Sequence, residues 1–196
     1  MKIKLLEKTS FGELCSLLRK VKLRNQEIFP YKEAEIVLKK VDFSQIYPSA
    51  TYVLERNLIF LADLRNRFLK ICQMDIFKLW NRIIFQTGKK DFVSMIPPII
   101  EYSEEDDCFV ILDGLHRLML ARLRRLDIFA LYLYNVKSCF PSIPIGWKDV
   151  KISTQVPQIK RYCRPGINDS ESNRYVLHRD LFPLTSNSSR VSSPVI

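Results

Sequence analysis

The residues best suited to chemistry form one short run, Asp113-Gly114-Leu115-His116-Arg117. The apolar residues before this run have strand character and the leucines after it have helical spacing, so the run stands at the start of a helix. A helix N-terminus offers free N–H groups and a positive dipole end, and an arginine and a histidine beside them suit phosphate oxygens. The run therefore predicts an anion site. A plainer alternative has Asp113 as the helix N-cap, with His116 and Arg117 on a solvated first turn.

The elements that position this run follow the order strand, acidic turn, strand, helix, strand. The acidic segment 103–107 joins two apolar stretches, 96–102 and 109–112, as a hairpin. A helix of about a dozen residues should follow the motif, and the apolar stretch that ends at Val136 should form one more strand. The motif is thus expected at a turn from a strand into a helix.

This order and this motif resemble the ParB/sulfiredoxin superfamily over residues 40–137. In that family the phosphate-binding turn reads Asp-Gly-x-His-Arg, Gly-Glu-Arg-Arg or Gly-Gly-Cys-His-Arg and lies between a strand and a helix. Pro97-Pro98, the apolar entry into Asp113-Gly114 and the small Ala121 also fit the family. The resemblance implies an α+β domain in which helices pack on a small mixed sheet.

The spelling of the motif separates the branches of this superfamily. Sulfiredoxins use the motif cysteine as a nucleophile, and Leu115 stands at that position, so thiol repair is excluded. Partition proteins carry two adjacent arginines and continue into a helix-turn-helix domain, whereas 60 residues follow Val136 here. The spelling is most similar to the free-serine kinases. That branch implies a nucleotide (ATP, ADP or CTP) with Mg²⁺ as cofactors and a small molecule, such as a free amino acid, as acceptor.

The resemblance also implies a role for each motif residue. Gly114 would let the backbone approach a phosphate, and His116 and Arg117 would bind and neutralise its oxygens. Asp113 would cap the helix or assist the metal-bound phosphate. The candidate nucleotide-binding residues are therefore Gly114, Leu115, His116 and Arg117, and no metal ligands of the protein's own are predicted.

The chain departs from the kinases at the position of the acidic residue that serves them as general base. Their acid lies just after the first strand, where this chain reads Tyr47-Pro-Ser-Ala-Thr51, and the nearest acid is Glu55, about one turn into the next helix. The candidate catalytic residues are thus Glu55, Asp113 and His116. We predict a nucleotide-dependent phosphotransferase. The alternatives are a ParB-like DNA-binding or nuclease accessory protein and a catalytically inactive regulatory module.

The distribution of charge leaves nucleic acid open as a partner. The net charge is +10, with nine excess positive charges in residues 1–90, five in residues 137–196, and four excess negative charges in residues 91–136. Basic flanks of this kind can contact nucleic acid through nonspecific electrostatics, although solvated helix faces rich in lysine give the same pattern. The sequence says nothing about the oligomeric state.

The remaining composition predicts a cytoplasmic protein that does not enter a membrane. No apolar run reaches the length of a membrane span, and the N-terminal apolar core is too short for a signal peptide. The five cysteines are scattered without a close pair, so neither a zinc site nor a disulfide framework is predicted, and all five are expected to be packing residues.

Four segments are expected along the chain. Residues 1–39 form an extension with an amphipathic helix, whose capping box is Ser10 to Glu13. Residues 40–137 form the ParB/sulfiredoxin-like domain, residues 138–184 a second extension and residues 185–196 a disordered, serine-rich tail.

Within the domain, helical spacing without glycine or proline from Ala50 to Gln86 predicts two helices divided near Gln73–Asp75. Because family members usually have one short helix here, the second is expected to be an insertion at about 74–90. His178-Arg179-Asp180 spells a kinase catalytic loop, but Thr185 stands where that loop needs asparagine, so the match is attributed to chance.

Overall fold

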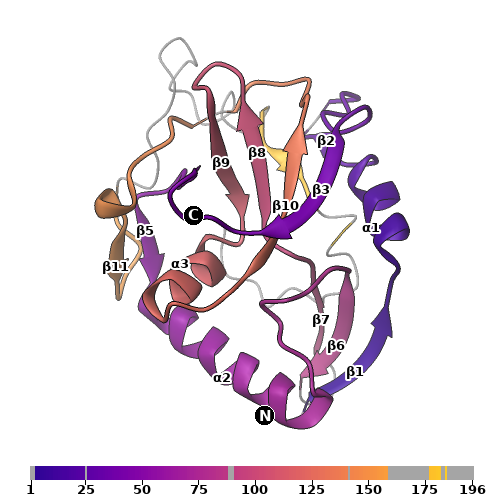
Figure 1. Cartoon of the computed structure of the whole chain (residues 1–196), viewed down its shortest axis with the longest axis vertical. Coiled ribbons are helices and arrows are strands. Elements are labelled where there is room, and N and C mark those ends of the chain that lie inside the picture. The colour runs from indigo at the N-terminus through magenta and orange to yellow at the C-terminus, as the bar shows by residue number, and fades with distance from the viewer. Residues whose placement is uncertain are drawn as a thin grey trace.

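A five-stranded mixed sheet forms the centre of the protein (Figure 1). The computed structural model describes residues 3–24, 26–87, 91–140, 142–158, 177–181 and 184. The strand order is β3-β10-β8-β9-β4, with β10 parallel to β8 and β4 parallel to β9. The strands are β3 (Glu35–Lys40), β4 (Ile46–Tyr47), β8 (Ile99–Ser103), β9 (Cys108–Asp113) and β10 (Phe129–Tyr134). The predicted hairpin and the strand that ends near Val136 are therefore confirmed.

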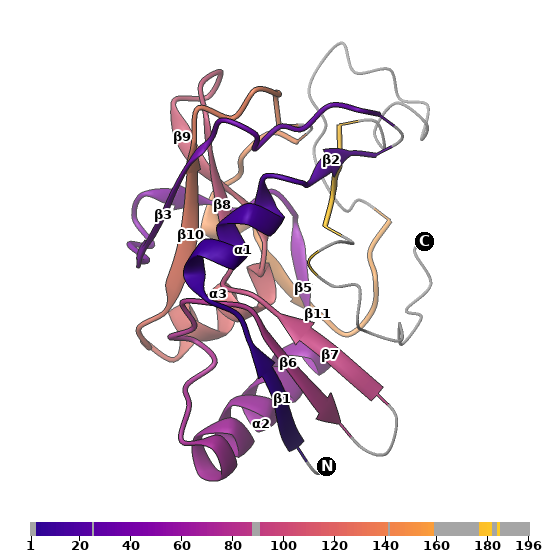
Figure 2. The same cartoon turned by 90° about the vertical axis from the view of Figure 1, so that its right-hand side faces the viewer.

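Helices cover both faces of this sheet. Because successive side chains of a strand point to opposite faces, β10 sends Leu131 and Leu133 into one core cluster and Ala130 and Tyr132 into another. The first cluster includes residues of α1 (Phe11–Leu18), which lies beside the sheet in Figure 2. The second cluster includes residues of α2 (Glu55–Cys72) and α3 (Leu115–Leu123), the two helices at the lower left of Figure 1. The predicted α+β class is confirmed.

The segment after α2 folds as a turn and a hairpin, so the helical insertion predicted at about 74–90 is wrong. The helix ends because Gln73 takes a left-handed backbone with φ 51°. The Asp75 carboxylate then accepts the Phe77 N–H at 3.0 Å and pairs with Arg65 at 2.6 Å, which fixes a turn without glycine or proline. Residues 83–87 form β6 (Ile83–Thr87), which pairs with β1 (Ile3–Lys8) and with β7 (Asp91–Met95) in an antiparallel sheet.

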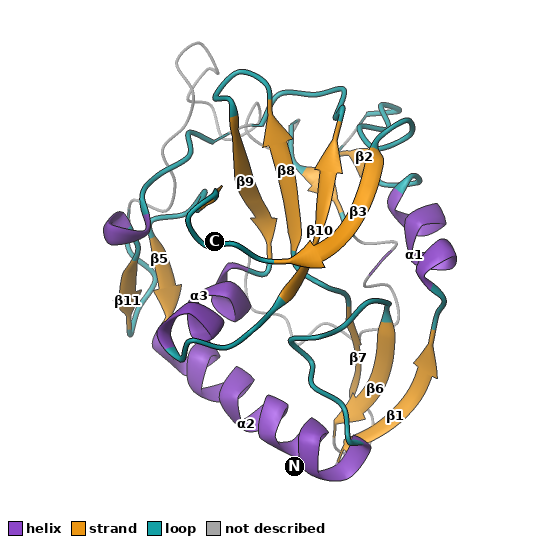
Figure 3. Cartoon of the chain, viewed as in Figure 1, coloured by secondary structure: helices purple, strands orange, loops and turns teal. Residues whose placement is uncertain are grey.

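Two short strand pairs attach residues 151–153 and 179–180 to this body, as the colouring by secondary structure shows (Figure 3). The parallel pair joins β5 (Tyr52–Leu54) to β11 (Lys151–Ser153), which follows a 3-10 turn at Trp147–Asp149. The antiparallel pair joins β2 (Lys22–Leu23) to β12 (Arg179–Asp180).

Other sequence expectations have mixed outcomes. The capping box of α1 is confirmed, because Ser10 Oγ accepts the Glu13 N–H and Glu13 accepts the Ser10 N–H. The strand β3 crosses the boundary expected at residues 39 and 40. The tail 185–196 and Cys163 lie outside the described residues.

The cysteines differ in their exposure. Cys15 is buried as expected of a packing residue, but Cys139 is exposed. In the described part of the chain, no helix is both apolar enough and long enough to cross a lipid bilayer.

A buried ion pair holds β12 in place and gives Arg179, the arginine of the kinase-like letters at 178–180, a structural role. Arg179 donates to both carboxylate oxygens of Glu101, at 3.1 and 2.7 Å, and the Tyr31 hydroxyl donates to the same carboxylate. The Arg179 side chain is 0% exposed and the Glu101 side chain 2%. Further carbonyl oxygens accept from the same guanidinium, so the buried charges are hydrogen-bonded on several sides. Arg179 is therefore a structural anchor.

We expect Arg179→Met to lower the free energy of unfolding by about 3–5 kcal/mol, because Glu101 would stay buried without its cation. Urea unfolding monitored by circular dichroism measures the loss. The double variant Glu101→Gln/Arg179→Met should be more stable than Arg179→Met alone. As a matched control, Lys137→Met breaks the exposed pair with Glu33 and should leave the midpoint unchanged. Equal effects of the two single substitutions would contradict the anchoring role.

Candidate functional site

The predicted motif forms a tight turn between β9 and α3. Gly114 is the N-cap of α3 and has φ 86°, a left-handed backbone that side chains disfavour. A Cβ atom at Gly114 would lie 2.8 Å from Cβ of Pro98 and 3.0 Å from its Cα. The carbonyl of Pro98 in turn accepts the Leu131 N–H at 2.8 Å, which holds this proline at the sheet. The close approach of Pro98 therefore leaves no room for a side chain at position 114.

Arg117 is buried beneath this turn. One terminal nitrogen of its guanidinium donates to the Ile96 carbonyl and the other to Asp113 Oδ2 at 3.2 Å. Burial lowers the pKa of Arg117, and the neighbouring Asp113 carboxylate opposes that effect. The solvated first turn is therefore wrong for Arg117. The N-cap role of Asp113 is also wrong, because α3 has no side-chain cap and the Asp113 carboxylate pairs with Arg117 instead.

His116 joins α3 to the start of α2. Its Nε2 accepts the backbone N–H of Leu54 at 2.9 Å and lies 3.3 Å from Nδ2 of Asn57. Leu54 is the N-cap residue of α2, so the histidine satisfies a helix-terminal N–H group. An Nε2 that accepts must be unprotonated, which assigns the neutral imidazole with its proton on Nδ1. Burial lowers the pKa of His116, again opposed by Asp113, and favours the same neutral form.

A cavity of about 600 Å³ opens beside the turn. All five motif residues line it, so the structure brings Asp113, Gly114, Leu115, His116 and Arg117 together around one space. Leu115 also packs against the larger core cluster. The other lining residues come from distant parts of the chain and were not predicted: Ala50, Tyr52, Leu61, Ser94, Met95, Ile96, Leu112 and Leu181.

Glu55 lies outside this cavity. The helix α2 begins at Glu55, because residues 52–54 form β5 instead of continuing a helix from Ala50. The Glu55 side chain is exposed and does not line the cavity. The acid that does line it is Asp113, whose side chain is 44% exposed. The second contact of His116, Asn57, was missed because an asparagine in the first turns of a helix carries no signal of its own.

The described residues contain no group of three histidine, cysteine or acidic side chains that could hold a metal ion. A divalent cation at this cavity would therefore take most of its ligands from a bound phosphate and from water. Mg²⁺ behaves in this way in many phosphate sites, where one or two carboxylates suffice.

Comparison with known families assigns the class of the protein. Residues 13–151 match the family model of the ParB CE domain. The chain belongs to this ParB-like family, and the match runs from within α1 to the first residue of β11. No curated protein and no solved structure matches the chain.

We expect Gly114→Ala to lower the free energy of unfolding by about 1–3 kcal/mol for the left-handed backbone alone, with an added cost as Pro98 shifts. Gly12→Ala is the matched control. Gly12 lies inside α1 and an added Cβ would meet only Ser10 Oγ at 4.0 Å, so that variant should gain about 0.5–1 kcal/mol. Thermal unfolding of both proteins tests the pair. An unchanged stability of Gly114→Ala would show that the turn does not need glycine.

We expect acid to weaken the fold through His116. Its pKa is about 6.5 when unfolded and lower when folded, so the unfolded chain binds more protons between the two values. The contribution is complete above pH 6.5 and is lost as the pH falls through the lower folded pKa. Urea unfolding at pH 7.5, 6.5 and 5.5 measures this slope. His116→Gln should flatten it, and a slope that persists in this variant would assign it to another group.

Proposed function

We propose that the cavity at the β9–α3 turn binds the phosphates of a nucleotide together with Mg²⁺. The observation that carries the proposal is the position of Asp113, a half-exposed carboxylate at the mouth of a helix N-terminus. The hydrogen-bond ladder of α3 starts with the Leu118 N–H, which donates to the Gly114 carbonyl at 3.0 Å. The three preceding N–H groups have no intrahelical acceptor, and in this proposal they donate to phosphate oxygens.

Arg117 supports this role from below the turn. Its two contacts, to Ile96 and Asp113, hold the guanidinium in one place, so its positive charge acts on the cavity without a further cost of ordering. Asp113 keeps enough exposed surface to coordinate a cation that enters with the phosphates. When bound, Mg²⁺ would neutralise phosphate charge. Tyr52, Leu61 and Met95 offer apolar surface for the rest of the nucleotide.

Phosphoryl transfer to a small-molecule acceptor is the second candidate, and it is the activity of the free-serine kinase branch. Such a reaction depends on positioning, charge neutralisation and an acid within reach of the acceptor hydroxyl. Asp113 lines the cavity and Glu55 does not, so Asp113 is the better candidate for that acid. In this proposal Glu55 is an exposed residue of the first turn of α2, where a carboxylate suits the helix dipole.

We expect ATP, ADP or CTP to raise the melting temperature more with Mg²⁺ than without it. A ligand at a hundred times its dissociation constant adds roughly 2.7 kcal/mol. Asp113→Asn should remove the part that depends on Mg²⁺. Asp127→Asn makes the same change on an exposed carboxylate paired with Lys40 and should keep the full shift.

If Asp113→Asn retained the Mg²⁺-dependent shift, the carboxylate would have no part in binding. Formation of ADP from ATP in the presence of free amino acids, measured on the same samples, separates the kinase from a domain that only binds.

A further inference from the structure

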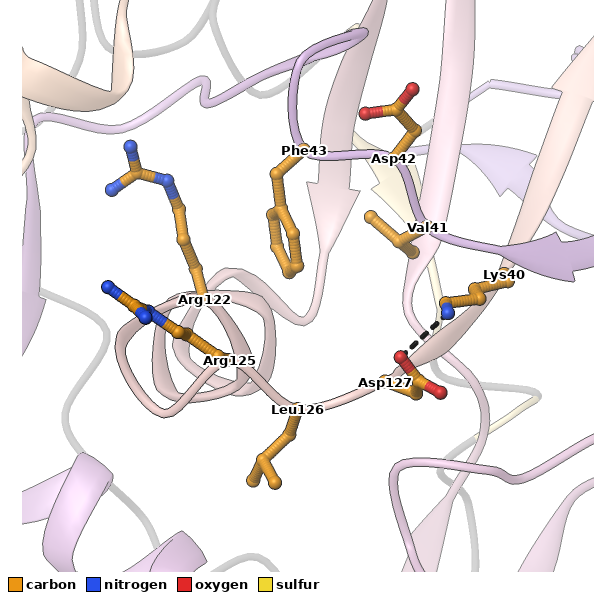
Figure 4. A pocket seen from close by; sticks show the side chains of 8 residues that line it. All are labelled: Lys40, Val41, Asp42, Phe43, Arg122, Arg125, Leu126 and Asp127. Atoms are coloured by element: carbon orange, nitrogen blue, oxygen red, sulfur yellow. Dashed lines mark ion pairs between the residues drawn. The ribbon is translucent and has the colours of Figure 1, made fainter.

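A second hollow, of about 570 Å³, lies at the opposite end of α3 (Figure 4). One wall is the end of β3 and the connection to β4, residues 40–43. The other wall is the end of α3 and the turn that follows it, with Arg122 and residues 125–127. Because α3 rises about 1.5 Å per residue, this hollow is separated from the β9–α3 turn by roughly 13 Å of helix.

Two arginines supply positive charge here that no carboxylate of the described residues neutralises. Arg122 and Arg125 are exposed, and Figure 4 shows their guanidinium groups extending to the same side of the hollow. Lys40 and Asp127 pair at 2.8 Å and cancel each other's charge. The Asp42 carboxylate accepts from the backbone and hydroxyl of Ser44 at 2.9 and 2.7 Å and keeps its negative charge. The two arginines outnumber this one carboxylate, so the net charge of the lining residues is positive.

Arg125 occupies a backbone position where a glycine would be more stable. Its φ is 51°, and the turn closes with the Leu126 N–H donating to Ala121 at 2.9 Å and the Arg125 N–H donating to Arg122 at 3.3 Å. This is the left-handed residue after a helix, which is usually glycine and costs roughly 1 kcal/mol or more for other side chains. An arginine at this position is explained if its side chain binds a ligand, because that contact would offset the cost of the left-handed backbone.

One aromatic ring, that of Phe43, lines the hollow, and it contacts Trp147. The ring of Phe43 faces the space beside the two arginines, and its centroid lies 5.7 Å from that of Trp147 in an edge contact. The guanidinium of Arg122 lies over the Trp147 ring at 5.2 Å. Trp147 itself is fixed, because its Nε1 donates to the Ile46 carbonyl at 3.0 Å. The guanidinium of Arg122 and the ring of Trp147 are therefore held next to each other.

We propose that this hollow binds single-stranded nucleic acid, with Arg122 and Arg125 on successive phosphates and a base stacked on Phe43. Exposed arginines without a carboxylate partner suit a repeating polyanion, because each contact is weak and several are needed. A ring beside them suits an unpaired base, whose face a duplex would hide. The net charge of +10 attracts the same ligand. This inference does not rest on the nucleotide site at the other end of α3.

The experiment measures fluorescence anisotropy of a short labelled oligonucleotide of mixed sequence against the full chain, between 50 and 200 mM salt, without nucleotide or Mg²⁺. The double variant Arg122→Gln/Arg125→Gln should bind more weakly and reduce the slope of log K against log salt by about 1.4, since each neutralised phosphate contributes about 0.7. The matched control is Arg19→Gln/Lys20→Gln, which removes two exposed cations from the end of α1, on the other side of the molecule (Figure 1). It should keep the slope of the unmodified protein.

Two single variants separate stacking and backbone effects from charge. Phe43→Leu keeps an apolar side chain beside Trp147 and should lose the affinity of one stacked base, roughly 5- to 150-fold. Arg125→Gly should weaken binding while the unfolding midpoint stays or rises, because the left-handed backbone is relieved.

The proposal is overturned by an unchanged slope in the double arginine variant, by a duplex of the same length that binds as tightly as the single strand, or by inorganic polyphosphate that competes as well as the oligonucleotide. A mononucleotide that competes as strongly as the strand also overturns it, because the ligand would then be a free nucleotide.

Discussion

The buried guanidinium of Arg117 is the contact on which the geometry of the β9–α3 turn depends. A cation in this position must be hydrogen-bonded, and the Ile96 carbonyl and the Asp113 carboxylate provide the acceptors. These contacts tie the residues before β8, the end of β9 and the first turn of α3 together. The left-handed Gly114 and the adjacent Pro98 are compatible with this arrangement and with few others. The geometry of the turn is therefore built on an internal ion pair.

His116 extends the same arrangement to α2. Its acceptance of the Leu54 N–H places the N-termini of α2 and α3 next to each other, so two positive helix ends meet near one cavity. A neutral imidazole is needed between them, since a proton on Nε2 would meet the N–H of Leu54 donor to donor. His116, predicted to bind phosphate, therefore has a structural role between the two helices.

The parts of the fold that could be predicted from the sequence are those in which neighbours in the chain are neighbours in space. The hairpin of β8 and β9, the turn at Gly114 and the helix after it follow from short-range patterns. The pairing of β1 with β6 joins residues about 80 positions apart, and the apolar residues at 77, 80 and 84 imitate a helix although they lie in a loop and a strand.

In the candidate site, too, only the residues that are neighbours in the chain could be predicted. The motif residues could be predicted because glycine, histidine and arginine stand close together between a strand pattern and a helix pattern. The burial of Arg117 and the contact of Asn57 with His116 depend on how α2 and α3 pack, which no local pattern contains. Glu55 was chosen for its place in the chain, and one strand, β5, was enough to move the start of α2 and leave it outside the cavity.

The pairing of Glu101 with Arg179 also imposes an order on biosynthesis. Glu101 lies in the central strand β8, whereas its cation arrives 78 residues later. While the ribosome is still translating that interval, a closed sheet buries the Glu101 side chain without its counter-charge, which is unfavourable. We therefore expect the central sheet to be less stable until Arg179 has been added, and nascent chains that stop before Arg179 should be substrates for chaperones and proteases.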